Sequence, residues 1–517
     1  MSSPVPVPRV KSGVTRLIFT AISIVLQLIV IVAIAEKFSH FAEWISIGLS
    51  LIALLAVFVI SAQDKTSALK TPWIILILVF PVFGLTLYLL VGMSGSTRKM
   101  RKRFTEIDEA LMPQLESDAE TIAQLDAIDR PCANIARYID SQAHYPLYRN
   151  TDIEFYADAS DGLDAQIEEL KKAEHFIFME YHAIEDSYSF HRVRDILADK
   201  VKQGVEVRLF YDDMGSIGFI NTDFIERMEA LGIQCRVFNP FKIILNVFLN
   251  NRDHRKITVI DGKVGFTGGY NLADEYFNIT HPYGMWKDTG VKITGEAVRS
   301  LTVTFLEMWN AVNEDDVRDA DFARYLPKLP YVSQENGFIL PYADTPMGEE
   351  AVGQNVYLSI IEQAQDYCYL ATPYLILTDE MNHALRLASK RGVDVRIITP
   401  GIPDKKPVYK VTRSYYHSLA ADGVRIFEWT PGFIHAKQCV ADDKVAVCGT
   451  INLDYRSFYH HFENACLFAH CKAVADVKQD FDATFAECED VTEKYATGQD
   501  AAMRFSQLIM RLFAPLL

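Results

Sequence analysis

The chain reads His254-Arg-Lys-Ile-Thr-Val-Ile-Asp261 and, in its second half, His435-Ala-Lys-Gln-Cys-Val-Ala-Asp442. Histidine, lysine and aspartate hold the same offsets in both stretches. A glycine and an asparagine follow each histidine at the same spacing, as Gly268 and Asn271 and then as Gly449 and Asn452. One His-x-Lys-x4-Asp pattern carries a real risk of chance occurrence. Two copies with the same continuation indicate a duplicated half-site.

The duplication extends into the surrounding secondary-structure pattern. Gly204-Val-Glu-Val-Arg208 in the first half matches Gly392-Val-Asp-Val-Arg396 in the second. In each half a strand-like run (176–179, then 367–371) precedes a helical run that ends at one of these glycines, and a second strand-like run follows. Strands that alternate with helices predict βαβ units. We therefore expect an α/β fold of two similar lobes, 146–325 and 326–517, with mixed sheets flanked by helices and related by a pseudo-twofold axis.

Composition narrows the class of protein. The net charge is -16, from 51 basic and 67 acidic residues, which argues against nucleic acid as a partner because such proteins need a basic face. The eight cysteines form no CxxC pair and no cluster with zinc spacing, so we expect free thiols. The sequence indicates no metal site and no cofactor, and it leaves the oligomeric state open.

Residues 1–95 contain three apolar runs, at 17–35, 44–62 and 72–92. Each approaches the roughly 20 residues that a helix needs to cross a bilayer. We therefore predict a transmembrane or membrane-embedded segment over 1–95, and linker helices over 96–145. A C-terminal amphipathic tail over 503–517 is expected to lie at the membrane surface.

Which side of the membrane the two lobes occupy depends on the third apolar run. If it spans, the basic residues divide five against six, and the positive-inside rule decides nothing. The run is interrupted at Phe80-Pro81-Val82-Phe83-Gly84, and a re-entrant segment that bends there would place all the other basic residues of this region opposite Lys37 alone. That alternative favours the two lobes lying on the cytoplasmic face of the membrane.

The paired motifs suit chemistry at a phosphodiester. Residues i and i+2 of a strand point to one face, so His254 projects with Lys256, and His435 with Lys437. Two ammonium groups can stabilise negative charge on phosphate oxygens, while one imidazole attacks phosphorus and the other acts as acid and base. Candidate catalytic residues are His254, Lys256, Asp261, His435, Lys437 and Asp442. The two aspartates, at the far ends of the strands, are better placed to brace the fold than to touch substrate.

A nucleophilic imidazole needs its second nitrogen held, usually by a carboxylate. One candidate lies downstream of the motif in each half: Asp288, in Trp286-Lys287-Asp288, follows His254, and Glu463, in Phe462-Glu463-Asn464, follows His435. We expect these two acids to orient the histidines. Asn271 and Asn452 are the candidate donors to the substrate phosphate.

The motifs make the chain resemble the phospholipase D superfamily and, within it, bacterial cardiolipin synthases. The resemblance covers nearly the whole chain. It rests on segments 251–256, 259–262, 268–271 and 274–276 of the first half, and on 372–374, 433–437, 449–452, 454–458 and Glu463 of the second. Thr450 stands where the family usually has glycine or serine.

The resemblance implies a membrane enzyme that acts on phosphatidylglycerol in a lipid bilayer. One phosphatidylglycerol would phosphatidylate a histidine, His254 being our choice, and a second would accept the phosphatidyl group to give cardiolipin and glycerol. The motifs alone leave three alternatives: a phospholipase D that transfers to water or another alcohol, a nuclease, and an inactive lipid-binding scaffold.

Overall fold

The structure is a computed structural model. It describes residues 25, 29, 42–63, 66–89, 95–240, 251–312, 321–328, 330–497, 510–512 and 514. The predicted run 17–35 and the predicted tail 503–517 therefore fall almost entirely outside the described residues. All eight cysteines are free thiols.

A mixed seven-stranded sheet forms the first lobe, in the order β1-β9-β7-β6-β2-β3-β4. Strands β2, β3 and β4 are parallel to one another, and the other pairings are antiparallel. The strands are β1 (Thr151–Tyr156), β2 (Phe176–Tyr181), β3 (Glu206–Asp212), β4 (Gln234–Phe238), β6 (Lys256–Ile260), β7 (Val264–Gly268) and β9 (Gly290–Gly295). The accompanying helices are α8 (Ala159–Leu170), α9 (Tyr188–Lys202), α10 (Phe224–Ala230), α11 (Val298–Val312) and the 3-10 helices η5 (Asp274–Phe277) and η6 (Phe322–Tyr325).

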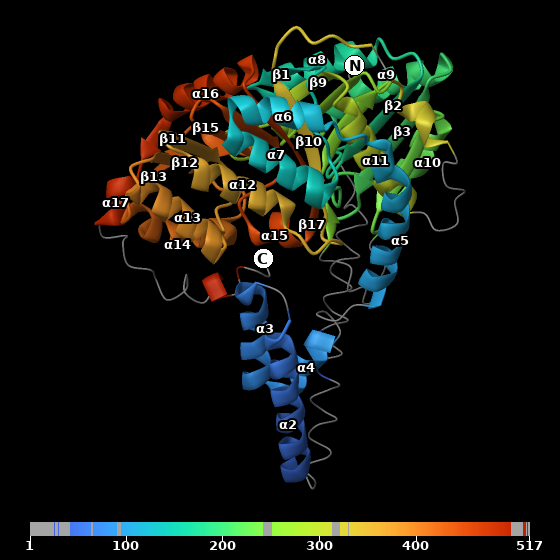
Figure 1. The fold of residues 1–517 in the computed structure, drawn as a ribbon. Coiled ribbons are helices and arrows are strands. Elements are labelled where there is room, and N and C mark those ends of the chain that lie inside the picture. Colours follow the sequence, from blue (N-terminus) through green and yellow to red (C-terminus); the bar gives the residue numbers. More distant parts are fainter. Residues whose placement is uncertain are drawn as a thin grey trace, which may run out of the picture.

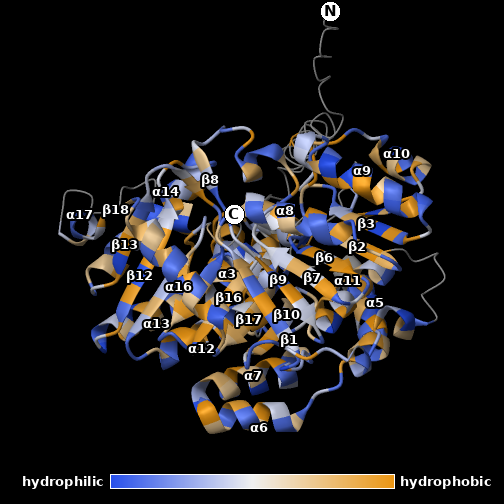
Figure 2. Cartoon of the chain, turned by 90° about the horizontal axis from the view of Figure 1, so that it is seen from above, coloured by the Kyte–Doolittle hydropathy of each residue, from blue (hydrophilic) through white to orange (hydrophobic). Residues whose placement is uncertain are grey.

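The second lobe repeats this topology strand for strand. Its order is β10-β17-β16-β15-β11-β12-β13, with β18 added at the edge. The strands are β10 (Phe338–Asp344), β11 (Tyr367–Ala371), β12 (Asp394–Pro400), β13 (Arg425–Trp429), β15 (Gln438–Ala441), β16 (Val445–Gly449), β17 (His461–Ala469) and β18 (Cys488–Asp490). The helices are α12 (Val352–Gln363), α13 (Asp379–Lys390), α14 (Lys406–Ala420), α15 (Tyr455–Tyr459), α16 (Lys472–Phe485) and α17 (Thr492–Ala496). The predicted mixed α/β fold with two similar halves is confirmed, and Figure 2 shows the two lobes side by side.

Two short parallel pairings join the lobes. Strand β5 (Arg252–Asp253) of the first half pairs with the start of β17, in the register Phe462↔Asp253. Strand β14 (Gly432–Ile434) of the second half pairs with β8 (Met285–Lys287) of the first, in the register Ile434↔Lys287. One continuous apolar core also contains side chains of both halves, among them Phe178 and Leu467. The duplicated units are therefore interlocked.

The helices that precede the first lobe are α5 (Gly95–Leu111), η3 (Met112–Gln114), α6 (Ala119–Ile128) and α7 (Arg130–Ala143). Helices α6 and α7 each begin at an aspartate whose side chain accepts backbone N–H groups of the first turn, Asp118 and Asp129. Such N-caps satisfy donors that a helix start leaves unpaired. Helix α7 packs against α12 and β10 of the second lobe and buries Ile135 and Ile139, and α6 packs against α7.

The N-terminal helices stand apart from the α/β body in Figure 1. The predicted run 44–62 corresponds to α2 (Ala42–Ser61), and the run 72–92 is divided between α3 (Ser67–Val79) and α4 (Pro81–Leu87). Within the described residues, no helix combines the length and apolar character that crossing a bilayer requires. The prediction of three separate spans is not met by these helices.

The third run reverses direction where the sequence is interrupted. A continuous helix would separate Ile77 from Gly84 by roughly 10 Å. Instead, a Cβ on Gly84 would lie only 2.6 Å from the carbonyl oxygen of Leu76. Only glycine permits this approach, and Pro81 at the start of α4 favours the break because it cannot continue the hydrogen bonding of α3.

Candidate active site

Each motif histidine leaves a short strand that is paired with the other lobe. His254 follows β5 and donates its backbone N–H to the carbonyl of Phe462, at 2.9 Å. His435 follows β14 and donates its N–H to the carbonyl of Lys287, at 2.7 Å. In both cases the next residue of the partner strand is the predicted orienting acid. The two inter-lobe strand pairings thus place a carboxylate beside each imidazole.

The carboxylates are exchanged between the lobes. His254 Nδ1 lies 2.9 Å from Glu463 Oε2 of the second lobe. His435 Nδ1 lies 2.6 Å from Asp288 Oδ2 of the first. The sequence offered one acid in each half and suggested pairing within a half. The register of β5 with β17 and of β14 with β8 decides otherwise.

Of the two acids, Glu463 accepts side-chain hydrogen bonds from more residues. Its oxygens accept hydrogen bonds from the hydroxyls of Ser457, at 2.7 Å, and of Thr450, in addition to His254. Thr450, at the position that departs from the family's usual residue, therefore fixes the orienting carboxylate. The sequence pointed to this stretch only through the family resemblance.

Both imidazoles are poised as neutral bases. Burial first, and the nearby lysine ammonium groups second, lower the pKa of His254 and of His435 well below the usual value. An ionised carboxylate can only accept, so at His254 Nδ1 carries the proton beside Glu463 and Nε2 keeps its lone pair. At His435, Nδ1 lies 2.6 Å from Asp288 Oδ2 and 2.8 Å from Lys437 Nζ, and the same tautomer holds when Asp288 is ionised. Burial also raises the pKa of Asp288 to about 7. Each ring can therefore act as nucleophile or base through Nε2.

The two lysines are buried beside the histidines and anchored by them. Lys256 Nζ donates to the carbonyl oxygen of His254 at 2.6 Å, and Lys437 Nζ donates to that of His435. Burial lowers the pKa of Lys256 to about 8 and that of Lys437 to about 7. The nearby carboxylates therefore do not fully balance the buried positive charge of either lysine, and a bound phosphodiester would supply the missing negative charge.

These pKa values predict the alkaline limb of the pH profile. The ammonium form is needed to stabilise phosphate charge, and it disappears as pH rises through the lysine pKa. We expect kcat/KM to fall between about pH 7 and 8, measured on a soluble short-chain phosphatidylglycerol at constant ionic strength. An arginine at position 437 stays charged over this range, so Lys437→Arg should abolish the fall near pH 7 and keep the one near pH 8. A decline that begins only near the ordinary lysine pKa of about 10.4 would contradict this assignment.

Asp261 and Asp442 hold backbone at the far ends of β6 and β15. Asp261 accepts the N–H groups of Glu174, His175 and Phe176 at 2.8, 2.7 and 2.8 Å, and Asp442 accepts those of residues 365–367 at 2.8, 2.9 and 2.9 Å. The length of β6 places Asp261 roughly 15 Å from the histidine end. We therefore replace the catalytic assignment of both aspartates with a positioning role, fixing the entry of β2 and β11.

Asp261→Asn and Asp442→Asn should accordingly lower stability more than chemistry. Both residues have a φ of 53°, which asparagine tolerates, so the substitution mainly weakens acceptors for three N–H groups. We expect each to destabilise the fold by about 1–3 kcal/mol, seen in thermal melts, with turnover per folded molecule within a few-fold of the unmodified chain. Loss of turnover by orders of magnitude at an unchanged melting temperature would restore a catalytic role.

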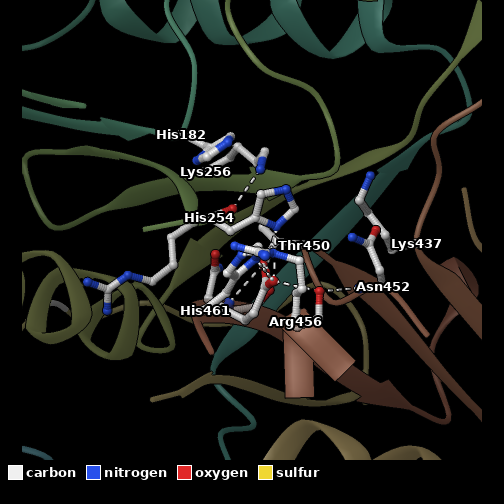
Figure 3. A network of polar contacts seen from close by, with 12 residues as sticks. His182, His254, Lys256, Lys437, Thr450, Asn452, Arg456 and His461 are labelled. Carbon is white, nitrogen blue, oxygen red and sulfur yellow. Dashed lines mark hydrogen bonds and ion pairs between the residues drawn. The ribbon is translucent and has the colours of Figure 1, made fainter. Parts of the chain in front are cut away.

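Asn271 and Asn452 line the same cavity as the histidines, but they differ in availability. The amide of Asn271 is already engaged: its oxygen accepts from the N–H of Ala183 at 3.1 Å, and its nitrogen donates to the hydroxyl of Tyr276 at 2.8 Å. Asn452 Oδ1 is buried without a hydrogen bond. Figure 3 shows Asn452 with Lys437 across from His254. The free group of Asn452 is thus an acceptor, which can receive a hydrogen bond from a substrate hydroxyl but cannot donate to a phosphate oxygen, and its amide group donates to Asp454.

The cavity encloses about 610 Å³ and is lined by residues of both lobes, including His254 and His435. The sequence missed several of its polar residues. His182 and His461 have ring centroids 4.9 and 5.4 Å from that of His254. Figure 3 shows both side chains close to His254. His461 belongs to the stretch that carries the motif acid Glu463, whereas His182 had no signal, because only the pairing of β2 with β6 brings it to the site.

Within the part of the chain that the structure describes, two groups of side chains have donor atoms close enough to hold a metal ion. These are His254, His461 and Glu463, and, remote from the cavity, Asp129, Cys132 and His470. Hydrogen bonding accounts for the key acids in both. Glu463 serves His254, Ser457 and Thr450, while Asp129 caps α7 and pairs with His470 at 3.1 Å. Neither group is therefore assigned to a metal.

Comparison with known families agrees with this geometry. Residues 166–309 and 357–485 match the family "Cardiolipin synthase, PLD-like domain", and residues 48–92 match "Phospholipase_D-nuclease N-terminal". A cardiolipin synthase of Oceanobacillus iheyensis is 32% identical over 471 residues, covering 90% of this chain and 96% of the relative. Cardiolipin synthase 2 of Bacillus cereus is 31% identical over 460 residues, 89% of each chain.

An uncharacterized protein of Streptococcus mutans is 40% identical over 460 residues, 89% of this chain and 99% of the relative. Among solved structures, phosphatidylserine synthase of Haemophilus influenzae matches with a TM-score of 0.55 at 15% identity, covering 74% of this chain and 98% of that one. That likeness concerns the fold alone. The chain thus belongs to the cardiolipin synthases with phospholipase D-like domains.

Proposed function

We propose that the chain makes cardiolipin and glycerol from two molecules of phosphatidylglycerol, as a phosphatidyltransferase. The observation that carries this proposal is the single cavity lined by two histidines, each held by a carboxylate of the opposite lobe and accompanied by a buried lysine. Such a site can split one phosphoryl transfer into two displacements at the same phosphorus.

In the first displacement His254 Nε2 attacks phosphorus and forms the N–P bond, while the bond from phosphorus to the headgroup glycerol oxygen breaks. His435, protonated in the substrate complex, gives its Nε2 proton to that oxygen, and glycerol leaves. The bound phosphodiester favours this protonation because its negative charge offsets the two ammonium groups that depress the pKa of His435.

In the second displacement the free hydroxyl of another phosphatidylglycerol attacks the phosphohistidine. His435 Nε2 takes the hydroxyl proton, the N–P bond breaks, and His254 is restored as cardiolipin leaves. Lys256 and Lys437 stabilise the phosphate oxygens through both steps. Asp288 and Glu463 stabilise the positive charge that each ring acquires.

Incubation of the full chain with phosphatidylglycerol vesicles tests this function. We expect cardiolipin and glycerol in equal amounts, and neither product from His254→Asn. Phosphatidic acid with glycerol instead of cardiolipin would replace the proposal with a hydrolytic phospholipase D. Absence of any product would point to an inactive lipid-binding scaffold.

For localisation we propose the bacterial cytoplasmic membrane, entered through residues 1–95, with the catalytic lobes on the cytoplasmic side. The reversal between α3 and α4 supports a re-entrant third run, which would return the chain to the side it came from. The partners would then be phosphatidylglycerol and the bilayer itself. A reporter fused after Gly95 that is active only outside the cytoplasm would refute this topology.

A further inference from the structure

The active-site cavity has two chemically different halves. Beside His254 lie His182 and His461, and Arg456 donates to His461 at 3.1 Å; Arg252 and the carboxylate of Asp454 also line the cavity. Around His435 the wall is made of aromatic rings and carboxylates. In the proposed mechanism the phosphodiester lies between the two histidines, and beyond His435 the aromatic rings and the carboxylates of Glu275 and Asp404 disfavour a second anion. The half around His435 therefore suits the part of a substrate that carries no charge.

Aromatic rings enclose His435 closely. The ring centroids of Tyr276, Trp286 and Phe433 lie 5.3, 5.3 and 5.8 Å from that of His435. Tyr374 extends this wall, with its ring centroid 6.3 Å from that of Phe433. Such faces pack against the CH groups of a small organic ligand and exclude bulk water.

Two carboxylates, Glu275 and Asp404, also line this half. Asp404 is oriented by the hydroxyl of Tyr374, which donates to Oδ2 at 2.5 Å, and by the N–H of Lys405, which donates to Oδ1 at 2.6 Å. Among the described residues, none donates a hydrogen bond to the carboxylate of Glu275. Partial burial and repulsion by Glu185 and Asp404 raise the pKa of Glu275 to about 7. When ionised, the carboxylate of Glu275 is therefore a hydrogen-bond acceptor in the cavity wall to which a ligand can donate.

We propose that Glu275 and Asp404, with the aromatic wall around His435, form the subsite for the glycerol headgroup and select a polyol as leaving group and as acceptor. This rests on the proposed function and deepens it. One hydroxyl of the glycerol exchanges its proton with His435, and the adjacent hydroxyl donates to the carboxylates. A carboxylate accepts up to four hydrogen bonds and donates none when ionised, so it matches a diol and not a phosphate.

A cationic headgroup is the competing occupant, because aromatic rings and acids also bind ammonium groups. The chain already supplies a cation here. Lys405 Nζ lies 3.6 Å from Asp404 Oδ2 and 5.2 Å from the ring centroid of Tyr374. This internal ammonium group partly neutralises the acids, which leaves their hydrogen-bonding capacity for a neutral ligand.

Acceptor competition tests the subsite. The full chain is incubated with phosphatidylglycerol vesicles in the presence of both labelled glycerol and 1-propanol. The measured quantity is the ratio of the two exchange products, labelled phosphatidylglycerol and phosphatidylpropanol. The two alcohols have equal carbon number and differ in the hydroxyls under test. We expect a preference for glycerol of about 10- to 100-fold, the range for a hydrogen bond to a charged group.

Glu275→Leu and Asp404→Asn should each reduce this preference about tenfold, and Glu275→Gln should reduce it less because its amide oxygen still accepts. The ratio of products does not depend on how much enzyme is folded. Glu349→Gln is the matched control, since Glu349 is an exposed acid that neither lines the cavity nor shifts the pKa of Glu275, and it should leave the ratio unchanged.

The outcomes separate this inference from the function on which it rests. Cardiolipin formation with an unchanged alcohol ratio in Glu275→Leu and Asp404→Asn would overturn only the subsite. A preference for ethanolamine or choline over glycerol would overturn it in favour of a cation site. Absence of cardiolipin and of headgroup exchange in the unmodified chain would instead overturn the proposed function.

Discussion

Replacing His254 with asparagine is expected to lower cardiolipin formation by roughly 10⁴-fold or more, the scale seen when a nucleophile is removed from a concerted site. His435→Asn should cost a similar factor with the natural lipid, because glycerol is a poor leaving group without a proton donor. Both side chains are largely buried, at 9% and 8% exposed, so each ring is held by fixed protein groups that a water molecule would not reproduce.

A soluble p-nitrophenyl phosphodiester should distinguish the roles of the two histidines, because its leaving group departs without protonation. His435→Asn should give a burst of about one equivalent of p-nitrophenolate per site and then stall, because no base activates the acceptor. His254→Asn should give no burst. A burst in His254→Asn and none in His435→Asn would reverse the roles of nucleophile and acid/base.

The orienting carboxylates should have the second largest effects. Glu463→Gln and Asp288→Asn preserve shape, but an amide can present its NH₂ to Nδ1 and so favour the wrong tautomer. We expect losses of about 10³- to 10⁴-fold in turnover, as for comparable buried histidine–carboxylate pairs. The fold should survive, because these changes keep the shape of the side chain and leave most core contacts intact. An unchanged thermal melt would check this.

The exchange of acids between lobes gives these variants distinct signatures. Glu463→Gln disables the partner of His254 and should abolish the p-nitrophenolate burst. Asp288→Asn disables the partner of His435 and should keep the burst while slowing the steady state. Were the acids to act within their own halves, the two signatures would be swapped. Thr450→Val, which removes a hydroxyl donor to Glu463 and retains the branched shape, should resemble a mild Glu463→Gln.

The sequence by itself determined the duplicated fold and the reacting groups. Periodicity and the shared motif predicted two α/β lobes because each half carries the same alternation of strands and helices, and the two sheets have the same strand order. His254, Lys256, His435 and Lys437 were predictable from the shared motif, but the expected strand geometry was wrong. His254 lies between β5 and β6, and His435 and Lys437 lie between β14 and β15, where each lysine donates to the carbonyl oxygen of its histidine.

Only the tertiary structure decided which acid serves which histidine. Glu463 is 209 residues from His254 in the chain, and Asp288 is 147 residues from His435. No local pattern specifies contacts over such distances; they arise from two inter-lobe strand registers, β5 with β17 and β14 with β8. The asymmetry of the cavity has the same origin, because its basic and aromatic walls combine side chains from loops of both lobes that only the packed core brings together.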